Sequence, residues 1–489
     1  QVPEGLAGKL PALKQLSEAR SQDLFVAEAL RGLGPLVQQA QVLAAQYDAV
    51  VANPPYMGGK YLPLILRTYL KDCYPGYEKD FFSAFIDRDL AFSKPHGRLG
   101  FMSPFVWMFI SSHEYLRTRL INEENITSLV QLEYSGFEGA TVPICTFTLQ
   151  KGHLSGLKGC YIRLSDFRGS QNQGPKTLEA VQNRACSWFF EAAQDEFKKI
   201  PGSPVAYWMS EAIRNIFTGT KMGEFFNTEG QNKTTNNERY LRYVWEVKKE
   251  SIGPNKKWVI CAKGGSFRKW AGNLENLIDW SLTTRTFYSK DHSARIIDSK
   301  FWYLEGITWT DITSASTAFR YLPSGCTYET AGPTLFVRHV KIFAVLAYLN
   351  SPFAAYAIDV LNPTMHVKVR DIRALPFDVS DEPLLDRVSR SAVGLVDSAM
   401  ADWDAYERSW DFQFLPLLTI SSEPVQSLES RYTSWIKSNR ATIAEMQRLE
   451  EENNRLFIDA YGLADELTPD VPIEQITLTV NPAYRYGIK

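Results

Sequence analysis

Strand-like and helix-like patterns alternate through the first 200 residues. Apolar positions such as Leu24, Ala27 and Leu30 recur at three-to-four spacing within residues 5–46, which predicts helices. The β-branched run Tyr47–Ala52 predicts a short buried strand, and the prolines that follow it end that strand. Further strands are expected at residues 97–102, 126–132, 142–149 and 161–164, and further helices at residues 81–92 and 111–122. This alternation predicts an α/β sheet, whose strand ends are the default place for a ligand.

The pattern changes after residue 200. Asn, Thr, Gly and aromatic residues become frequent, the expected strands are short, and one helix is expected at residues 339–361. Residues 427–461 lack Pro and Gly and carry the amphipathic stripe of a long helix. We therefore expect four segments: a helical lead-in at 1–46, a catalytic α/β domain at 47–200, a mixed α+β domain at 201–377 and a helical region at 378–489.

The composition narrows the class of protein. The 489 residues are 45% hydrophobic, 13% aromatic and 22% charged, which excludes a disordered or fibrous chain. No run approaches the roughly 18 apolar residues of a membrane span, so no membrane partner is expected. The six cysteines form no Cys-x-x-Cys pair, which fits a reducing cytoplasm. The chain begins with Gln1 and shows no signal-peptide pattern, so we expect a piece of a longer protein.

Charge is uneven along the chain. Residues 1–200 carry a net charge of +1, residues 201–377 carry +7, and residues 378–489 carry −10. A basic segment rich in aromatic residues is typical of a protein that binds a polyanion, because each Lys or Arg that meets a phosphate releases a counterion. A solvated surface that happens to be positive explains the same numbers. The charge alone leaves both interpretations open.

The tetrapeptide Asn53-Pro54-Pro55-Tyr56 directly follows the expected strand Tyr47–Ala52. One interpretation is a proline-stiffened turn, because Asn-Pro starts turns well. The other is methyl transfer to an exocyclic amino group. An adenine 6-amino nitrogen is a poor nucleophile, and two acceptors aimed at its hydrogens would raise its electron density. The side-chain oxygen of Asn53 and the carbonyl oxygen of Pro54 suit this task, and the ring of Tyr56 would stack on the base.

Two consecutive prolines support this chemistry, because they fix φ and lack amide hydrogens, which leaves carbonyl oxygens for a substrate. The reaction would be a direct displacement at the methyl group of S-adenosylmethionine, without a metal or a covalent enzyme intermediate. A base inside a duplex must be rotated out of the stack and held between apolar walls. Phe137 is a candidate for the second wall, and an ordinary core phenylalanine is the alternative.

Several segments resemble a known family. Residues 47–56, 79–86, 97–104 and 137–149 resemble, in order, motifs IV, V, VI and VIII of gamma-class adenine-specific DNA methyltransferases. Longer motifs are similar to the PglX family of bacterial BREX phage-defence systems. These motifs are Phe197-Lys-Lys-Ile-Pro-Gly-Ser-Pro204, Lys263-Gly-Gly-Ser-Phe-Arg-Lys-Trp270, Gly306-Ile-Thr-Trp309, Phe319-Arg-Tyr-Leu-Pro323 and Asn362-Pro-Thr364. The resemblance covers residues 1 to about 420.

The resemblance implies a Rossmann-like methyltransferase sheet followed by a target-recognition domain, which together mark double-stranded host DNA so that the defence spares it. It implies that Asn53, Pro54, Pro55 and Tyr56 hold the target adenine, that S-adenosylmethionine is the methyl donor, and that other BREX proteins are partners. Asp80 and Phe81 would line the cofactor or base pocket. A helix N-terminal Asp followed by a core aromatic residue is the alternative for these two.

One departure from the family concerns the cofactor. In this family a glycine-rich motif I and an acidic motif II precede the Asn-Pro-Pro-Tyr motif and hold S-adenosylmethionine. Residues 1–46 are expected to be helical and are too short for those strands. We therefore expect a partial sheet without the main cofactor half. The chain alone should bind S-adenosylmethionine weakly or not at all and should be inactive.

Candidate DNA contacts lie in the middle segment. Residues 263–270 interleave cations with glycine and aromatic residues, a composition suited to following a phosphate backbone. The candidates for phosphate contacts are Lys256, Lys257, Arg268 and Lys269, and Lys263 is a further candidate for DNA binding. The candidates for base contacts are Asn232, Lys233, Thr234 and Asn236. An ordinary solvated loop is the alternative for each of them.

Other chemistries find little support in the sequence. The six histidines lack ligand spacing, so no metal site is expected, and neither a phosphate loop nor a nucleophile elbow occurs. Three alternatives to a BREX DNA methyltransferase stay open. They are the modification-specificity part of a fused restriction enzyme, a catalytically inactive DNA-recognition module, and a methyltransferase that acts on RNA or protein.

Overall fold

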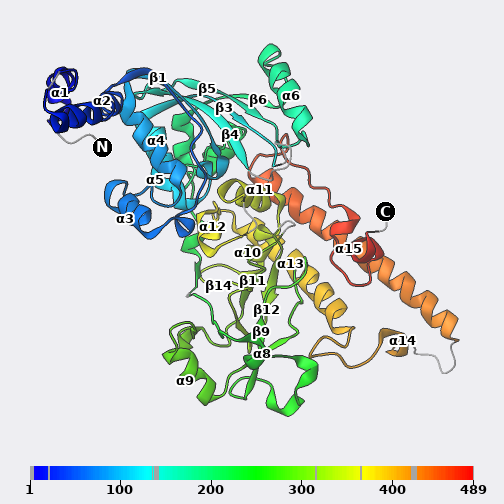
Figure 1. The fold of residues 1–489 in the computed structure, drawn as a ribbon. Helices are drawn as coiled ribbons and strands as arrows, with labels where there is room; N and C mark the ends of the chain where they lie inside the picture. Colours follow the sequence, from blue (N-terminus) through cyan, green and yellow to red (C-terminus); the bar gives the residue numbers. More distant parts are fainter. Residues whose placement is uncertain are drawn as a thin grey trace. The chain divides into compact units, whose positions relative to one another are not determined.

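The computed structural model describes residues 5–19, 22–134, 136, 143–228, 230–313, 317–363, 366–419 and 427–487. Its internal contacts divide the chain into two compact units, unit 1 (Gln1–Met209) and unit 2 (Ser210–Lys489). The ribbon in Figure 1 shows the elements of each unit. Both units combine sheets with helices, which confirms the expected mixed α/β class.

Unit 1 is built on one six-stranded sheet. Its strands are β1 (Tyr47–Ala52), β2 (Ser93–Pro104), β3 (Glu124–Gln131), β4 (Ile144–Lys151), β5 (Lys158–Arg163) and β6 (Phe189–Ala193). Its helices are α1 (Leu10–Ser17), α2 (Leu24–Ala44), α3 (Leu64–Cys73), α4 (Phe81–Phe92), α5 (Glu114–Glu123) and α6 (Ser170–Gln182). The strands lie in the order β1-β2-β4-β3-β5-β6.

The pairing directions place several strand ends together. β1 is parallel to β2 and β3 is parallel to β5, while β4 is antiparallel to both β2 and β3. The strands β1, β2, β3 and β5 therefore run in one direction and end at the same edge of the sheet. Helices α4 and α5 pack on one face (Figure 1) and bury Phe82, Ile86 and Leu120 completely. This core holds the shared edge in place.

The strand β1 forms where the sequence predicts it, but the expectation that it is buried is wrong. β1 is an edge strand with β2 as its partner, and Val51 is 85% exposed. A β-branched run indicates a strand because such side chains fit a pleated surface. The run does not encode how many neighbours the strand has, and only a strand covered on both sides becomes buried.

Unit 2 contains two four-stranded sheets with the orders β13-β9-β10-β8 and β12-β11-β14-β7. The strands are β7 (Phe226–Asn227), β8 (Leu241–Tyr243), β9 (Trp258–Ala262), β10 (Asn276–Asp279), β11 (Gly306–Trp309), β12 (Phe319–Leu322), β13 (Thr327–Tyr328) and β14 (Thr334–Val337). The shorter helices are α7 (Glu211–Ile216), α8 (Asn237–Tyr240), α9 (Leu282–Lys290), α12 (Val369–Ala374), α14 (Pro416–Thr419) and α16 (Pro482–Tyr486). The longer helices are α10 (Ile342–Leu349), α11 (Pro352–Leu361), α13 (Glu382–Asp404) and α15 (Leu428–Ala460).

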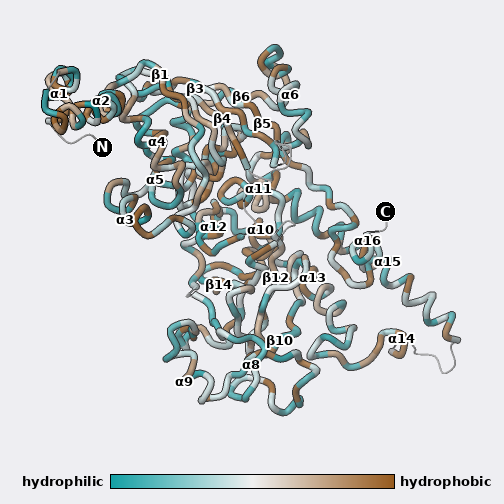
Figure 2. Tube along the Cα trace, viewed as in Figure 1, coloured by the Kyte–Doolittle hydropathy of each residue, from teal (hydrophilic) through white to brown (hydrophobic). Residues whose placement is uncertain are grey.

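The helix expected at residues 339–361 is two helices. Ser351 caps α11 by accepting a hydrogen bond from the backbone N–H of Ala354, and Pro352 occupies the first helical position. α10 and α11 therefore meet at an angle of 67°. Figure 2 shows α10 among the apolar segments of unit 2, and its residues from Ala344 to Leu349 are buried. Among the described helices none alone is long and apolar enough to cross a membrane, although α10 and α11 meet that length and composition as a bent pair.

The C-terminal helices belong to the same compact unit as the two small sheets. α13 packs against α10 and α15, and Nδ2 of Asn453 on α15 donates to the carbonyl oxygen of Ala347 on α10 across 3.0 Å. The long helix predicted at residues 427–461 is confirmed as α15. Acidic residues of the C-terminal region thus belong to the same compact unit as the basic segment that precedes it.

Candidate functional site

The turn after β1 carries Asn53-Pro54-Pro55-Tyr56 at the carboxyl edge of the sheet in unit 1. Asn53, Pro55 and Tyr56 are exposed, and Pro54 is buried. The tetrapeptide is thus open to solvent rather than sealed in the interior, with Tyr56 37% exposed. Carboxyl ends of strands that run in one direction are the usual place for a ligand in an α/β sheet. The location therefore fits a substrate site.

A hydrogen bond connects the two ends of this turn. The Tyr56 hydroxyl donates to Oδ1 of Asn53 at 3.1 Å. Partial burial and the nearby Cys145 thiol raise the pKa of Tyr56, so its hydroxyl stays protonated and keeps donating. Cys145 itself is buried at the start of β4, and burial raises its pKa to about 12. Tyr56 and Cys145 both stay protonated near neutral pH, so neither places a negative charge beside the oxygen of Asn53.

Asp80 fastens the turn to helix α4. Its Oδ1 accepts hydrogen bonds from the backbone N–H of Met57 at 3.1 Å and of Phe82 at 3.4 Å. Burial raises the pKa of Asp80, and these backbone donors oppose the shift. The N–H of Phe81 donates to the carbonyl oxygen of Met57 at 3.1 Å, which adds a second connection. Asp80 is therefore the N-cap of α4 and also stabilises the turn through its hydrogen bond with Met57.

Asp80 is a helix N-terminal residue and Phe81 packs in an aromatic pair, as the alternative interpretation of these two residues expected. A cofactor contact for them stays a prediction. Phe81 is half-buried and packs edge-on against Phe85, with ring centroids 5.0 Å apart. Oδ1 of Asp80 is committed to the backbone, and the exposed part of the half-buried Phe81 ring offers an apolar surface to a bound molecule. A flat apolar contact of this kind fits part of S-adenosylmethionine.

Two aromatic residues at this edge were not predicted from the sequence. Phe105 follows the end of β2, and Tyr134, which is 49% exposed, follows the end of β3. Their rings meet edge-to-face with centroids 5.7 Å apart. The signal that could have found them is their place just after two strands that end at the same edge as β1. The predicted second wall, Phe137, lies outside the described residues.

The predicted base contacts of unit 2 are mostly engaged in its interior. Asn232 is fully buried, donates to Thr327 and Tyr328, and accepts from the N–H of Ile297. Thr234 is 1% exposed and donates to the side chain of Asn237. The expectation that Asn232 and Thr234 reach base edges is therefore wrong, because their polar atoms are used inside the fold.

The other two base candidates remain at the surface. Oδ1 of Asn236 caps helix α8 by accepting from the N–H of Arg239 at 3.0 Å. Lys233 is exposed, and its backbone exchanges two hydrogen bonds with that of Arg295. The side chain of Lys233 is thereby carried on a fixed backbone and faces solvent, so a DNA contact for it stays a prediction.

Two predicted phosphate contacts are internal ion-pair partners. Arg268 is 1% exposed and donates from Nη1 to Oδ2 of Asp402 at 3.0 Å. Lys269 is 8% exposed and pairs with Glu450, which is 2% exposed. The expectation that these two cations contact phosphate is therefore wrong, because acidic residues 134 and 181 positions away cover them. Lys256 and Lys257 are exposed and Lys263 is half-buried, so their role stays a prediction.

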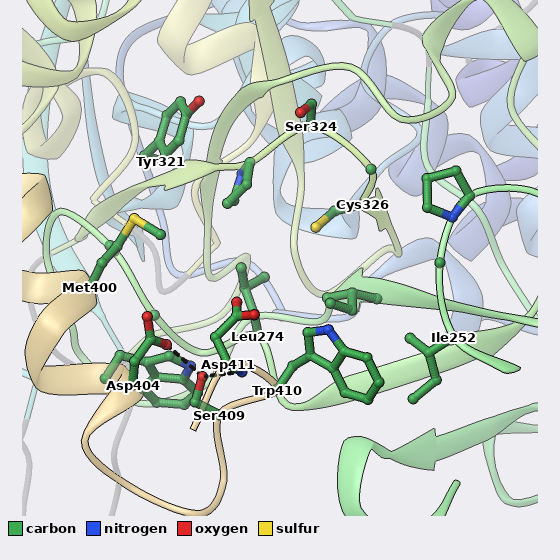
Figure 3. A pocket seen from close by; sticks show the side chains of 18 residues that line it. Ile252, Leu274, Tyr321, Ser324, Cys326, Met400, Asp404, Ser409, Trp410 and Asp411 are labelled. Carbon is green, nitrogen blue, oxygen red and sulfur yellow. Dashed lines mark hydrogen bonds between the residues drawn. The ribbon is translucent and has the colours of Figure 1, made fainter. Parts of the chain in front are cut away.

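A cavity of about 280 Å³ lies elsewhere in unit 2 (Figure 3). Asp404, Ser409 and Trp410 line one side, and Tyr321 and Cys326 lie opposite. Ser409 donates to Asp404 at 2.5 Å, and burial together with neighbouring Asp411 raises the pKa of Asp404. The lining is mainly apolar with an acidic rim. This lining lacks the arginines and lysines that hold a phosphate backbone. No group of three or more metal-ligating side chains occurs among the residues that the structure describes.

Comparison with known proteins identifies the relatives. The Eco57I restriction-modification methylase family model matches residues 15–137, which include the Asn53 turn. The adenine-specific methyltransferase PglX of Lacticaseibacillus casei (strain Zhang) is 31% identical over 89% of this chain and 38% of its own length. The adenine-specific methyltransferase BrxX of Escherichia coli O9:H4 (strain HS) is 30% identical over 100% of this chain and 40% of its own length. The chain is a homologue of the PglX and BrxX methyltransferases.

The homology confirms the resemblance seen in the motifs. The chain spans about two fifths of the length of these two relatives. A solved structure of the Type IIL restriction-modification enzyme MmeI in complex with DNA shares the fold, with a TM-score of 0.53 and 10% identity over 90% of this chain and 57% of that chain. The similarity to PglX and BrxX extends through both units, so the Asn53 turn and the sheets of unit 2 belong to one homologous region.

Proposed function

We propose that this chain carries the catalytic turn and the DNA-recognition part of an adenine-specific DNA methyltransferase of the BREX type. The observation that carries the proposal is the exposed Asn53 carboxamide, set in a two-proline turn at the shared carboxyl edge of β1, β2, β3 and β5. The homology to PglX and BrxX supports adenine as the substrate. The MmeI structure, whose protein is bound to DNA, supports DNA as the partner.

The chemistry rests on acceptors rather than on a charged base. Oδ1 of Asn53 would accept one hydrogen of the 6-amino group, and the carbonyl oxygen of Pro54 would accept the other. Both acceptors raise the electron density on nitrogen and favour its pyramidal transition state. The Tyr56 ring would stack on the extruded base. When bound, S-adenosylmethionine supplies the methyl group as an electrophilic sulfonium carbon.

The atoms balance without a further reactant. The amino nitrogen forms a bond to the methyl carbon as the carbon–sulfur bond breaks, and the sulfur leaves as a neutral thioether. The nitrogen then loses one proton to solvent. Asn53 and Pro54 hold the hydrogens that point toward the protein, and the exposed position of Asn53 gives the released proton a path to water. No residue of the turn changes its own protonation state.

The test measures methyl transfer by the complete protein encoded by the reading frame that contains this chain. Labelled S-adenosylmethionine and DNA are incubated with the wild type, with Asn53→Ala and with Asn183→Ala, an exposed asparagine elsewhere in unit 1. We expect Asn53→Ala to lower kcat at least 100-fold, as the loss of one preorganised polar group does in other sites. Asn183→Ala should retain full activity. Nucleoside mass spectrometry should find N6-methyladenine, and transfer that survives Asn53→Ala would overturn the proposal.

A second candidate is the modification part of a fused restriction enzyme, favoured by the Eco57I restriction-modification methylase match to residues 15–137. Both candidates share the Asn53 chemistry and differ in whether the complete protein also cleaves DNA. Incubation of unmethylated phage DNA with the purified complete protein and Mg²⁺ distinguishes them. Specific fragments on a gel support the fused restriction enzyme, and intact methylated DNA supports the BREX methyltransferase.

A further inference from the structure

A basic hollow of about 610 Å³ lies in unit 2, lined partly by residues of the 263–270 motif and otherwise by residues of the C-terminal region that no sequence motif singles out. Its lining combines the loop after β9 with the segment after α13 and the C-terminal end of the described chain. Three guanidinium groups, those of Arg268, Arg408 and Arg485, line it together with the hydroxyl-bearing residues Tyr406 and Thr479. Two of the three arginines come from the region whose net charge is −10. The net negative charge of residues 378–489 therefore does not reveal this local cluster of arginines.

Arg268 is the fixed part of this hollow. Its Nη1 donates to Oδ2 of Asp402 at 3.0 Å and its Nη2 donates to Oγ1 of Thr479 at 2.6 Å. Nε of Arg268 is buried and has no hydrogen-bond partner among the described residues. Asp402 also accepts from the backbone N–H groups of Thr479 at 2.7 Å and Val480 at 3.1 Å. The Asp402 carboxylate is therefore already engaged by Arg268 and two backbone N–H groups.

Arg408 and Arg485 are not neutralised in the same way. Neither has an ion-pair partner within the part of the chain that the structure describes. The Arg408 guanidinium lies over the ring of Trp403, 4.3 Å from its centroid, and Arg485 is exposed on α16. Burial and the charge of Arg268 lower the pKa of Arg408, with partial relief from Glu275. The hollow thus holds two guanidinium groups without an ion pair among the described residues beside the ion-paired Arg268.

The three arginines line the hollow together with Tyr406. Burial raises the pKa of the Tyr406 hydroxyl, Asp402 adds to the rise, and Arg485, Arg408 and Arg268 each oppose it. All three arginines line the same hollow as this tyrosine, and their charges act on its hydroxyl. A tetrahedral anion with several acceptor oxygens matches a cluster of guanidinium donors and hydroxyl groups, since arginine binds phosphate through parallel N–H bonds.

The backbone around the hollow is built for close packing. Gly272 has φ +105°, and a Cβ at this position would lie 2.7 Å from Cδ of Arg268 and 3.0 Å from the ring of Trp403. Any larger residue at position 272 would displace both side chains. The glycine therefore lets Trp403 support Arg268 on one side and Arg408 on the other. The result is a rigid frame with an exposed arginine at its rim.

We propose that this hollow binds a backbone phosphate of DNA, with Arg408 and Arg485 as the contacts and Arg268 as the fixed support behind them. The inference rests on the proposed function only in naming DNA as the partner. It moves the expected phosphate contact from Arg268 and Lys269 to two arginines of the C-terminal region. A phosphate held there would neutralise the excess charge and fix the register of unit 2 on the duplex.

The test uses the 489-residue chain and a DNA duplex, with affinity measured by fluorescence anisotropy at several salt concentrations. Each of Arg408→Gln and Arg485→Gln should reduce the magnitude of the slope of log K against log salt by about 0.9, the value for one phosphate contact on B-DNA. Affinity at 0.15 M salt should fall roughly 3- to 10-fold. Arg440→Gln, which removes an exposed arginine from α15, is the matched control and should leave the slope unchanged.

Two additions to the experiment distinguish DNA phosphate from free phosphate and allow for a variant that fails to fold. Arg485 is exposed, so Arg485→Gln carries the test if Arg408→Gln unfolds through its contact with Trp403. Inorganic phosphate is titrated calorimetrically into the wild type and Arg485→Gln. Binding of phosphate that depends on Arg485 without any change in the DNA slope would overturn the inference in favour of a free phosphate ligand. Failure of the unsubstituted chain to bind DNA would also overturn it, whereas the methyl-transfer test on the complete protein would stand.

Discussion

The hydroxyl group of Tyr56 donates a hydrogen bond to Oδ1 of Asn53 across 3.1 Å. The bond spans the two prolines and holds the carboxamide oxygen in a turn whose φ angles are already fixed. A carbonyl oxygen has two lone pairs, so one remains for a hydrogen of an incoming amino group. Tyr56 therefore makes two separable contributions, a ring face for stacking and a hydroxyl that orients Asn53.

Two substitutions separate these contributions of Tyr56. Tyr56→Phe keeps the ring and removes one hydrogen bond, so kcat for methyl transfer by the complete protein should fall about 3- to 10-fold. Tyr56→Ala also removes the stacking face, which is worth about 1–3 kcal/mol, so a further loss of roughly 10-fold is expected. Steady-state incorporation of labelled methyl groups measures both variants. Equal activities of Tyr56→Phe and Tyr56→Ala would show that the ring does not stack on the base.

Asp80 offers a test that separates a structural brace from a cofactor contact. Asp80→Ala removes the acceptor for the N–H groups of Met57 and Phe82 and should destabilise the chain by about 1 kcal/mol, the usual cost of losing an N-cap. Asp80→Asn keeps the oxygen and should retain nearly full stability in urea unfolding. If Asp80 instead binds the cofactor through its charge, Asp80→Asn will raise the KM for S-adenosylmethionine while stability stays constant.

Strands β1 to β5 and helices α4 and α5 of unit 1 were predictable because their signals are local, whereas α3, α6 and β6 were not predicted. The run Tyr47–Ala52, the Gly-Arg-Leu-Gly-Phe-Met segment of β2 and the periodicity of α4 each determine an element within a dozen residues. The Asn53 turn was predictable for the same reason, since its chemistry is carried by four consecutive residues. The exposure of β1 was not, because it depends on which strands lie beside it.

The wrong predictions in unit 2 concern residues whose partners lie far away in the sequence. The composition of residues 263–270 predicts exposed cations, yet Arg268 pairs with Asp402 and Lys269 pairs with Glu450. The residues around Arg268 do not indicate that its ion-pair partner lies 134 positions later in the sequence. The excess of acidic residues in the C-terminal region was a usable signal, because part of it covers the basic segment. Arg408 and Arg485 were missed because that same excess masks them.

The buried pair of Lys269 and Glu450 predicts a loss of stability without a specific loss of DNA binding. Lys269→Met leaves Glu450 charged, 2% exposed and supported by a single donor, Nε1 of Trp270 at 2.7 Å. We expect a loss of about 3–5 kcal/mol in urea unfolding. Lys269→Met combined with Glu450→Met should recover most of it, since no buried charge remains. The salt slope of DNA binding, measured on folded protein, should stay at the wild-type value, and a reduced slope would restore Lys269 as a phosphate contact.

Two buried groups of unit 1 give opposite dependences of stability on pH. Burial, assisted by Arg117, lowers the pKa of His113 to about 4, and its Nδ1 lies 3.1 Å from Oγ of Ser83. The unfolded chain therefore binds the His113 proton first as pH falls below 6.5, and stability falls between pH 6.5 and 4. Burial raises the pKa of Asp89 to about 6 from 3.8, despite Arg88. The folded chain binds that proton first, so stability rises as pH falls from 6 to 3.8.

The two effects cancel in the wild type and separate in variants. Asp89→Asn should leave the His113 contribution alone, so that unit 1 loses about 2–3 kcal/mol between pH 6.5 and 4. His113→Gln should leave the Asp89 contribution alone, so that unit 1 gains a similar amount over nearly the same range. Both changes are measured by urea unfolding at each pH, in which limited proteolysis within unit 1 monitors the unfolding of that unit. The wild type and the double variant should both show a nearly flat profile, and a slope in the double variant would assign the pH dependence to other groups.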